Sequence, residues 1–175
     1  MKVSIAPAGA PDEKIVRGIH SVHPAQLAQA TEVIRESFAT VAAEFGLTRQ
    51  NCPTHTSFIT DEALRAQCDA GWAMYGLYDD TRLVGVVSLS DEGDGVYKLH
   101  NLAVLPGHRR KGYGKQLLDF CKARAIELGG RKIAIGIIEE NAVLKNWYAA
   151  NGFVHTGTKI VERLPFTVGY MEWEG

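Results

Sequence analysis

The chain has 175 residues, a mass of 19.1 kDa and 46% hydrophobic residues, a composition that suits a globular domain with a sizeable core and excludes a disordered chain. Lysine and arginine number 19 against 20 acidic residues, so the net charge is -1 and no global basic field exists to hold a nucleic acid. No apolar run reaches the roughly 20 residues of a membrane span, and no secretory signal is visible. We therefore expect a cytoplasmic protein without a nucleic-acid or membrane partner.

The N-terminal half predicts one strand followed by two helices. Residues 1–14 contain proline and glycine without a periodic pattern, which indicates a loose tail before a single domain at residues 15–175. Weak alternation indicates a short strand at residues 15–22. Apolar residues at three- and four-residue steps then predict two helices joined by a polar loop, at residues 27–45 and 61–70.

The rest of the chain alternates between apolar strand-like runs and helical patterns. Strands are expected at residues 73–78, 83–89, 96–105, 132–138, 153–161 and 166–173. Helices are expected at residues 112–128 and 142–150. This order predicts an α/β fold of the α+β type: a mixed, mostly antiparallel central sheet of about seven strands, with one strand–helix–strand crossover and about four flanking helices. The β-branched run at residues 132–138 is typical of a strand covered on both faces.

A basic, glycine-containing loop joins the predicted strand at residues 96–105 to the helix that follows it. The loop reads Arg109-Arg110-Lys111-Gly112-Tyr113-Gly114-Lys115. The glycines let the backbone turn tightly and approach a ligand, and the exposed N–H groups of a helix start favour an anion. Gln116 stands where a Walker A loop needs serine or threonine, and the third glycine of a dinucleotide fingerprint is missing. The loop therefore predicts a phosphate or diphosphate site of another type. The chain predicts no metal site.

Two motifs resemble those of the GNAT superfamily of N-acetyltransferases. The pattern R-x-x-G-x-G at residues 109–114, preceded by L-A-V-x-P at residues 102–106, resembles the family's coenzyme A pyrophosphate loop. The pattern N-x(6)-Y-x(3)-G-F, from Asn141 to Phe153, resembles the segment after its fifth strand. The resemblance implies the GNAT acyl-CoA N-acyltransferase fold, acetyl-CoA (coenzyme A) as the cofactor, and acetyl transfer to a primary amine by direct attack on the thioester. The N-terminal half, where substrate choice is usually made, carries no motif of comparable specificity.

The same resemblance implies a set of cofactor-binding residues. The diphosphate would lie on the amides of residues 109–114, and the pantetheine arm would run beside residues 102–104. The full set is Leu102, Ala103, Val104, Arg109, Arg110, Lys111, Gly112, Tyr113, Gly114, Lys115, Asn141 and Tyr148. Asn141 has a second interpretation as a helix cap.

Two catalytic residues are expected. The phenol of Tyr148 has a reference pKa of about 10, above that of a typical thiol, so it is the candidate general acid for the departing thiolate; the alternative is a packing role. His100 stands where family members often have a glutamate, and its reference pKa of about 6.5 makes it partly neutral at pH 7. It is the candidate general base. The alternative is that His100 has a structural role, in which case the base is Glu139, Glu140, His55 or a water chain.

A second functional class is compatible with the same loop. A non-catalytic acyl-CoA-binding or sensing module would keep the loop at residues 109–114 but would need neither Tyr148 nor a base, so the presence of Tyr148 favours the enzyme. The acceptor is an amine on a small molecule, a peptide N-terminus or a lysine. The last two strands offer an edge through which a homodimer can form.

Overall fold

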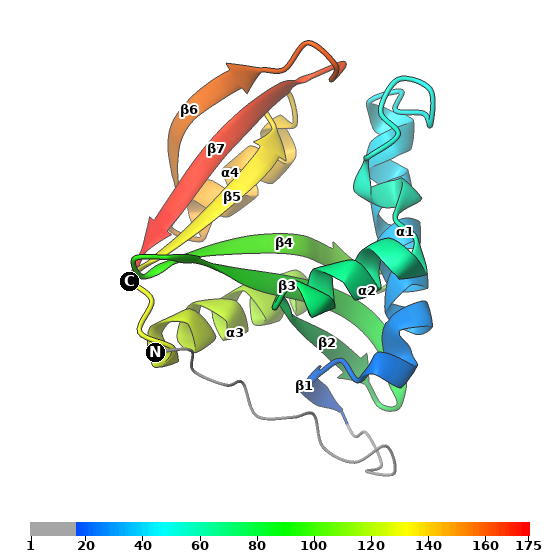
Figure 1. Cartoon of the computed structure of the whole chain (residues 1–175), viewed down its shortest axis with the longest axis vertical. Helices are drawn as coiled ribbons and strands as arrows, with labels where there is room; N and C mark the ends of the chain where they lie inside the picture. Colours follow the sequence, from blue (N-terminus) through cyan, green and yellow to red (C-terminus); the bar gives the residue numbers. More distant parts are fainter. Residues whose placement is uncertain (1–16) are drawn as a thin grey trace.

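The computed structural model describes residues 17–175 (Figure 1). The predicted tail at residues 1–14, and the first two residues of the strand predicted at residues 15–22, lie outside the described residues.

Seven strands form one mixed sheet in the order β1-β2-β3-β4-β5-β7-β6. Their bounds are β1 (Gly18–Ser21), β2 (Ala73–Asp79), β3 (Arg82–Gly93), β4 (Val96–Val104), β5 (Lys132–Ile138), β6 (Val154–Ile160) and β7 (Thr167–Glu174). Neighbouring strands pair antiparallel except for β4 and β5, which are parallel. The parallel pair is the predicted crossover, because a helix connects its two strands. The predicted fold class is confirmed.

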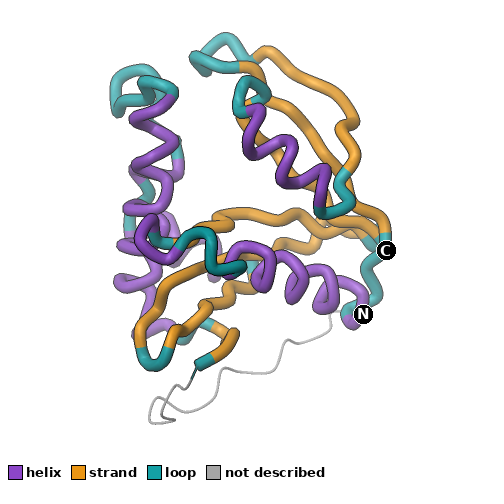
Figure 2. Tube along the Cα trace, turned by 180° about the vertical axis from the view of Figure 1, so that it is seen from behind, coloured by secondary structure: helices purple, strands orange, loops and turns teal. Residues whose placement is uncertain are grey.

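Within residues 17–175, four α-helices cover the sheet. They are α1 (Leu27–Glu44), α2 (Asp61–Asp69), α3 (Tyr113–Glu127) and α4 (Ala142–Ala150). Helix α2 lies on the face turned towards the viewer in Figure 1, whereas α3 and α4 lie on the face seen in Figure 2. Helix α1 packs against α2, β3 and β4. Because helices cover both faces of β3, its residues from Leu83 to Ser90 are all buried.

The strand predicted at residues 83–89 is longer in the structure. Asp91 continues the ladder and pairs with Tyr97, so most of the segment between the two strands predicted at residues 83–89 and 96–105 is itself strand. The reversal needs only Asp94 and Gly95, whose φ angles of 51° and 74° suit a two-residue hairpin turn.

The sheet divides between β4 and β5. The two strands pair only at their first residues, where Val96, Tyr97 and Lys98 lie opposite residues 132–134. They then diverge, as Figure 1 shows. The prediction that residues 132–138 are covered on both faces is therefore wrong, since Gly136 is exposed where β4 has moved away. The divergence leaves one edge of β4 without a strand partner.

Among residues 17–175, no helix has both the length and the apolar character that a membrane crossing requires.

Candidate active site

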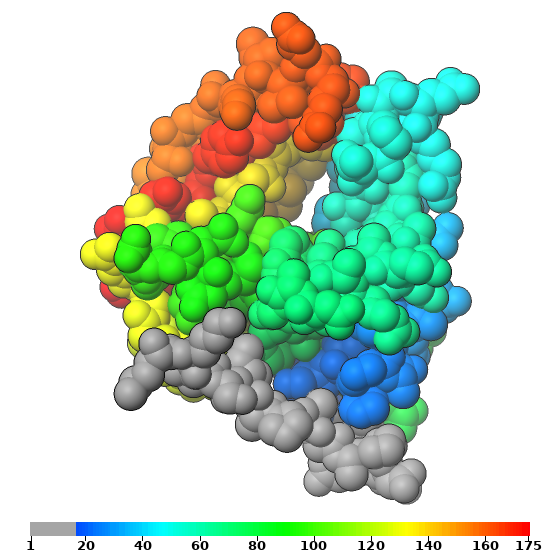
Figure 3. Space-filling view, in the orientation of Figure 1, coloured from blue at the N-terminus to red at the C-terminus, as the bar shows by residue number. Residues whose placement is uncertain are grey.

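A cleft of about 900 Å³ occupies the space between the diverging strands β4 and β5. Its walls also include α1, α4, the loop after α1 and the start of β7. Figure 3 shows the molecular surface hollowed here, between the cyan segment that follows α1 and the yellow-to-red strands β5 and β7. A concave site in the middle of a sheet, with main-chain edges along its walls, suits a long, partly extended ligand.

Strand β4 carries a β-bulge at the wall of the cleft. Ser88 pairs with His100 and Val86 with Ala103, so two steps along β3 correspond to three along β4. Asn101 adopts a left-handed conformation at φ 53°, and its side-chain amide donates to Gln67 Oε1 of α2 at 2.8 Å. A bulge re-aims the backbone next to it.

The predicted residues Leu102, Ala103 and Val104 follow this bulge and all line the cleft. The bulge therefore turns the main chain of the predicted thioester-binding segment relative to the sheet.

The start of α3 presents a run of unpaired main-chain donors. Among the described residues, no acceptor is bonded to the backbone N–H groups from Arg110 to Lys115. Arg110 and the N-cap residue Gly112 have φ angles of 63° and 78°, so the backbone curves around these donors. Successive N–H groups in such a curve, together with the helix dipole, form an anion-binding concavity. The backbone of this loop therefore fits a diphosphate.

The side chain of Arg109 is bound elsewhere. Its guanidinium donates to the carbonyl oxygen of Val104 at 3.2 Å, to Thr40 Oγ1 at 3.1 Å and to the carbonyl oxygen of Ser37 at 2.7 Å. Arg109 therefore ties the end of β4 to α1 and fixes the width of the cleft at this end.

The other predicted residues of the loop divide into two groups. The Tyr113 hydroxyl donates to Asp79 at 2.8 Å, and Lys115 pairs with Asp119 at 2.5 Å, so both side chains have protein partners. The Arg110–Lys111 side chains are exposed. The loop thus offers a ligand its backbone and two exposed cations that have no hydrogen-bond or ion-pair partner within residues 17–175.

Tyr148 lies deep in the wall of the cleft and is 5% exposed. Its ring makes edge contacts with Trp147 and Phe153, at centroid distances of 4.9 and 5.2 Å. Among the described residues, none is hydrogen-bonded to its hydroxyl. A phenol already keeps its proton at neutral pH, and burial raises the pKa of Tyr148 further.

Asn141 acts as the N-cap of α4, because its Oδ1 accepts the backbone N–H of Leu144 at 3.0 Å. The residue also lines the cleft. Both interpretations of Asn141 are therefore compatible with its position, and the cap fixes the helix that carries Tyr148.

His100 lies in a more enclosed environment than the sequence predicts. Its ring stacks on Trp72 at a centroid distance of 3.8 Å, and its Nε2 lies 2.9 Å from Ser90 Oγ. Since Ser90 donates its own hydrogen to Glu92, His100 Nε2 must donate to Ser90. Burial, with the nearby charge of Lys98, lowers the pKa of His100 to about 4. The expectation of partial protonation at pH 7 is wrong here, since the imidazole is neutral.

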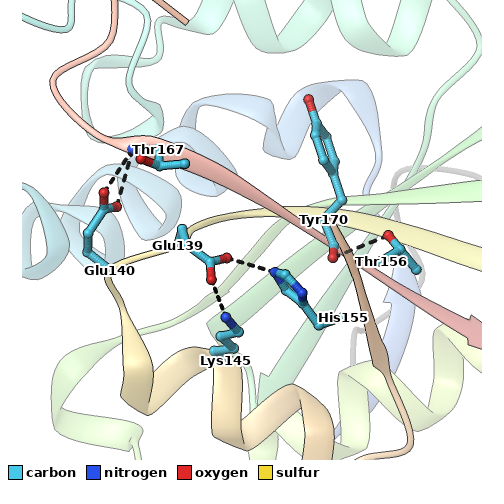
Figure 4. Close-up of polar contacts among 7 residues, drawn as sticks. All are labelled: Glu139, Glu140, Lys145, His155, Thr156, Thr167 and Tyr170. Atoms are coloured by element: carbon cyan, nitrogen blue, oxygen red, sulfur yellow. Dashed lines mark hydrogen bonds and ion pairs between the residues drawn. The ribbon is translucent and has the colours of Figure 1, made fainter. Parts of the chain in front are cut away.

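Glu139 and Glu140 lie outside the cleft and serve to join elements (Figure 4). Glu139 is paired with Lys145 of α4 and, at 2.9 Å, with His155 of β6. The hydrogen bond from Lys145 holds the pKa of Glu139 below its usual value. Glu140 accepts the backbone N–H of Thr167 at 3.0 Å. The two carboxylates therefore fix the corner from which α4 starts.

His55, the last candidate base, lines the cleft beside α1. Its Nδ1 accepts the backbone N–H of Ser57 at 3.3 Å, so the neutral ring carries its hydrogen on Nε2. Burial lowers the pKa of His55. In this tautomer His55 presents a donor to the cleft.

The residues of the cleft wall that the sequence did not predict as site residues include Lys98 and Asn101. For Asn101 a signal is present, because asparagine is rare inside a strand and tolerates a left-handed conformation. For Lys98 the pattern carries no such signal, since a lysine in an alternating strand is usually exposed to solvent.

Comparison with known proteins agrees with this arrangement. The model of the Acetyltransferase (GNAT) family matches residues 39–153. An uncharacterized N-acetyltransferase from Bacillus licheniformis is 37% identical over 65 residues, which are 31% of this chain and 41% of the relative. The matched part therefore spans less than half the length of that relative.

Two solved structures share the fold. The PaiA N-acetyltransferase of Thermoplasma acidophilum, in complex with coenzyme A, superimposes with a TM-score of 0.69 at 21% identity, over 90% of this chain and 98% of that one. The ribosomal-protein-S18-alanine N-acetyltransferase of Escherichia coli gives 0.72 at 14% identity, over 90% and 92%.

The family match covers more than half of the chain and includes both motifs on which the resemblance was based. This match confirms the predicted family. At the level of the family it also confirms an acyltransferase with acetyl-CoA as its cofactor. The protein with this cleft is a member of the GNAT family of acetyltransferases, which use acetyl-CoA.

Proposed function

We propose that this enzyme transfers the acetyl group of acetyl-CoA to a primary amine, which attacks the thioester directly within the β4–β5 cleft. The observation that carries this proposal is that the bulged edge of β4 and Tyr148 line the same cleft. Next to it lies the start of α3, whose first amides have no bonded acceptor among the described residues.

The backbone would hold the donor. The N–H groups from Arg110 to Lys115 would bind the diphosphate, and the exposed Arg110 and Lys111 side chains would add positive charge. The edge of β4 at residues 102–104 would bind the pantetheine arm as a strand-like partner. Bound acetyl-CoA supplies an activated acetyl thioester, and an amide near Ala103 would polarise its carbonyl group.

Two side chains would transfer protons during the reaction, one as a donor and one as an acceptor. The Tyr148 hydroxyl, protonated at neutral pH, would donate to the departing thiolate, whose own proton affinity rises in the same buried environment. His100 is neutral and donates from Nε2 to Ser90, so Nδ1 is its basic nitrogen. We assign proton acceptance to this atom through water. Because its pKa is low, the acceptor must bind largely as the free amine.

The alternative is a non-catalytic acyl-CoA-binding module. It needs no proton donor in the wall of the cleft, whereas the Tyr148 hydroxyl lies in that wall and has no bonded partner among the described residues. The position of Tyr148 therefore favours the enzyme. A cytoplasmic location and a homodimer remain our predictions.

A thiol-release screen tests this function. The purified protein is incubated with acetyl-CoA and a panel of primary amines and peptides, and each product is identified by mass. We expect one free thiol for each acetylated amine. Tight binding of acetyl-CoA without acetylation of any amine would instead support the binding module.

A further inference from the structure

The charges along the cleft suit a particular class of acceptor. Among the described residues that line it, Glu44 at the end of α1 is the one carboxylate, and Lys98 and Arg109 are the cations. The guanidinium of Arg109 is bound to α1 and to the end of β4. Lys98 is therefore the cation that remains available to a ligand from the wall of the cleft.

Lys98 is half-buried and, among residues 17–175, has no ion-pair or hydrogen-bond partner. It lies opposite Ala134, at the last paired position before β4 and β5 diverge, and two residues before His100 on the same face of β4. Its charge contributes to the lowered pKa of His100, so the ammonium lies within electrostatic range of the imidazole. An ammonium without a partner in the protein, at the wall of a cleft, can pair with an anionic group of a ligand that enters the cleft.

The position along β4 separates Lys98 from the donor. Ala103 stands five residues after Lys98, which corresponds to at most roughly 16 Å of strand at about 3.3 Å per residue. The predicted diphosphate site lies beyond Ala103, at the start of α3. Lys98 is thus too distant to serve the phosphates of the donor, and along β4 it lies on the opposite side of His100 from the predicted thioester-binding segment.

The same charge distribution disfavours polyamines. A polycationic acceptor needs several carboxylates to replace its hydration, and the described wall offers one, on the exposed Glu44. Lys98 would repel a second ammonium of such an acceptor.

We propose that Lys98 binds an anionic oxygen group of the acceptor, a carboxylate or a phosphate, so that the substrates are amines that carry an acid on the same molecule. This inference rests on the proposed acetyl transfer to amines and specifies its acceptor.

Matched acceptors test the proposal. The wild-type enzyme is assayed with acetyl-CoA and with ω-amino acids of increasing chain length, their methyl esters, aminoalkyl phosphates and diamines of equal length. For one chain length, we expect kcat/KM for an acid to exceed that for its ester and the diamine by about tenfold, a modest value for a charged contact that is half open to water. If kcat/KM is higher for the amino acid than for the aminoalkyl phosphate of equal length, Lys98 binds a carboxylate. If it is higher for the phosphate, Lys98 binds a phosphate.

Three variants assign the preference to Lys98. Lys98→Gln should abolish the preference for the acid over the ester, and Lys98→Glu should reverse it in favour of the diamine. Lys159→Gln, which removes the same charge from an exposed position on β6, should retain it.

The outcomes separate the two proposals. If amines are acetylated but acid and ester react equally well, or Lys98→Gln keeps the preference, the role of Lys98 is excluded while acetyl transfer stands. If no amine of any charge is acetylated although acetyl-CoA binds, the proposed function fails and this inference fails with it.

Discussion

At the scale of single residues, the site combines two titratable groups, Tyr148 and His100, whose neutral forms burial favours further. Tyr148 and His100 both have pKa values shifted so that the neutral form prevails at pH 7. A neutral phenol can donate a proton, and a neutral imidazole can accept one. The two expected roles are therefore available at the same pH, although the low pKa of His100 makes it a weak base.

Replacing Tyr148 with phenylalanine should slow turnover by about 10²–10⁴-fold, because the ring is kept and the proton donor is lost. Since none of the described residues is bonded to the hydroxyl, the fold and the affinity for acetyl-CoA should be retained. The measurement is kcat in the thiol-release assay, with acetyl-CoA affinity from calorimetry. Unchanged turnover, where chemistry limits the rate, would leave Tyr148 with a packing role.

The lowered pKa of His100 makes a prediction about stability. In the unfolded chain its pKa returns to about 6.5, so below that pH the unfolded state binds a proton that the folded state does not. Stability is therefore lost as the pH falls from about 6.5 towards 4. Allowing for partial exposure, we expect His100 to account for about 1 kcal/mol of the loss between pH 7 and pH 5.

Urea unfolding of the wild type and of His100→Gln at both pH values measures this difference. The variant should show a shallower pH dependence, since the other titrating groups are shared. Equal slopes would mean that His100 is solvated in the folded protein. In the same variant, the acetylation rate at pH 7 should fall if Nδ1 accepts the proton.

At the scale of elements, β4 is the strand that assembles the site. Its pairing with β5 stops after Lys98, a bulge follows at Asn101, and the strand ends beside the loop that starts α3. One strand thus provides an unpaired edge, a re-aimed backbone and a connection to the anion-binding loop. The left-handed conformation of Asn101 and its bond to Gln67 hold this geometry.

Two substitutions of Asn101 separate its conformation from its hydrogen bond. Alanine loses both and should cost about 1–2 kcal/mol of stability from the left-handed backbone alone, whereas glycine keeps the conformation and loses only the hydrogen bonds of the side-chain amide to Gln67 and Ser88.

We expect kcat to fall more in Asn101→Ala than in Asn101→Gly, with little change in acetyl-CoA affinity in either variant. Steady-state kinetics and urea unfolding provide the comparison. Equal kcat values in both variants and the wild type would show that the bulge does not position the thioester.

At the scale of the whole molecule, the sequence predicted the architecture because periodic apolar runs indicate helices and strands. It predicted the family because two motifs have the spacing typical of that family. It did not predict the divergence of β4 from β5, which depends on contacts far apart in the chain. That divergence left Gly136 exposed and made the interpretation of β5 wrong.

Side-chain roles were harder to predict than backbone roles for the same reason. Arg109 and Tyr113 were both predicted in the cofactor site, but their polar groups bind α1 and Asp79. A side chain of a basic loop can bind a ligand only if it is not already bonded to another part of the protein, and the sequence does not show these tertiary contacts. The backbone amides, whose availability follows from the helix start itself, were predictable.

The central claim is that the backbone at the start of α3 binds the diphosphate of acetyl-CoA. The affinity of coenzyme A for Gly112→Val, compared with the wild type and Gly107→Val, tests it most directly. Gly112 has a φ of 78° that valine tolerates poorly, whereas Gly107 has no such constraint, and a Cβ on either residue meets no protein atom within 4 Å. We predict that Gly112→Val remains folded and loses at least about tenfold in affinity, as expected when charge-assisted hydrogen bonds are lost, while Gly107→Val binds like the wild type. Unchanged affinity in folded Gly112→Val would contradict the account.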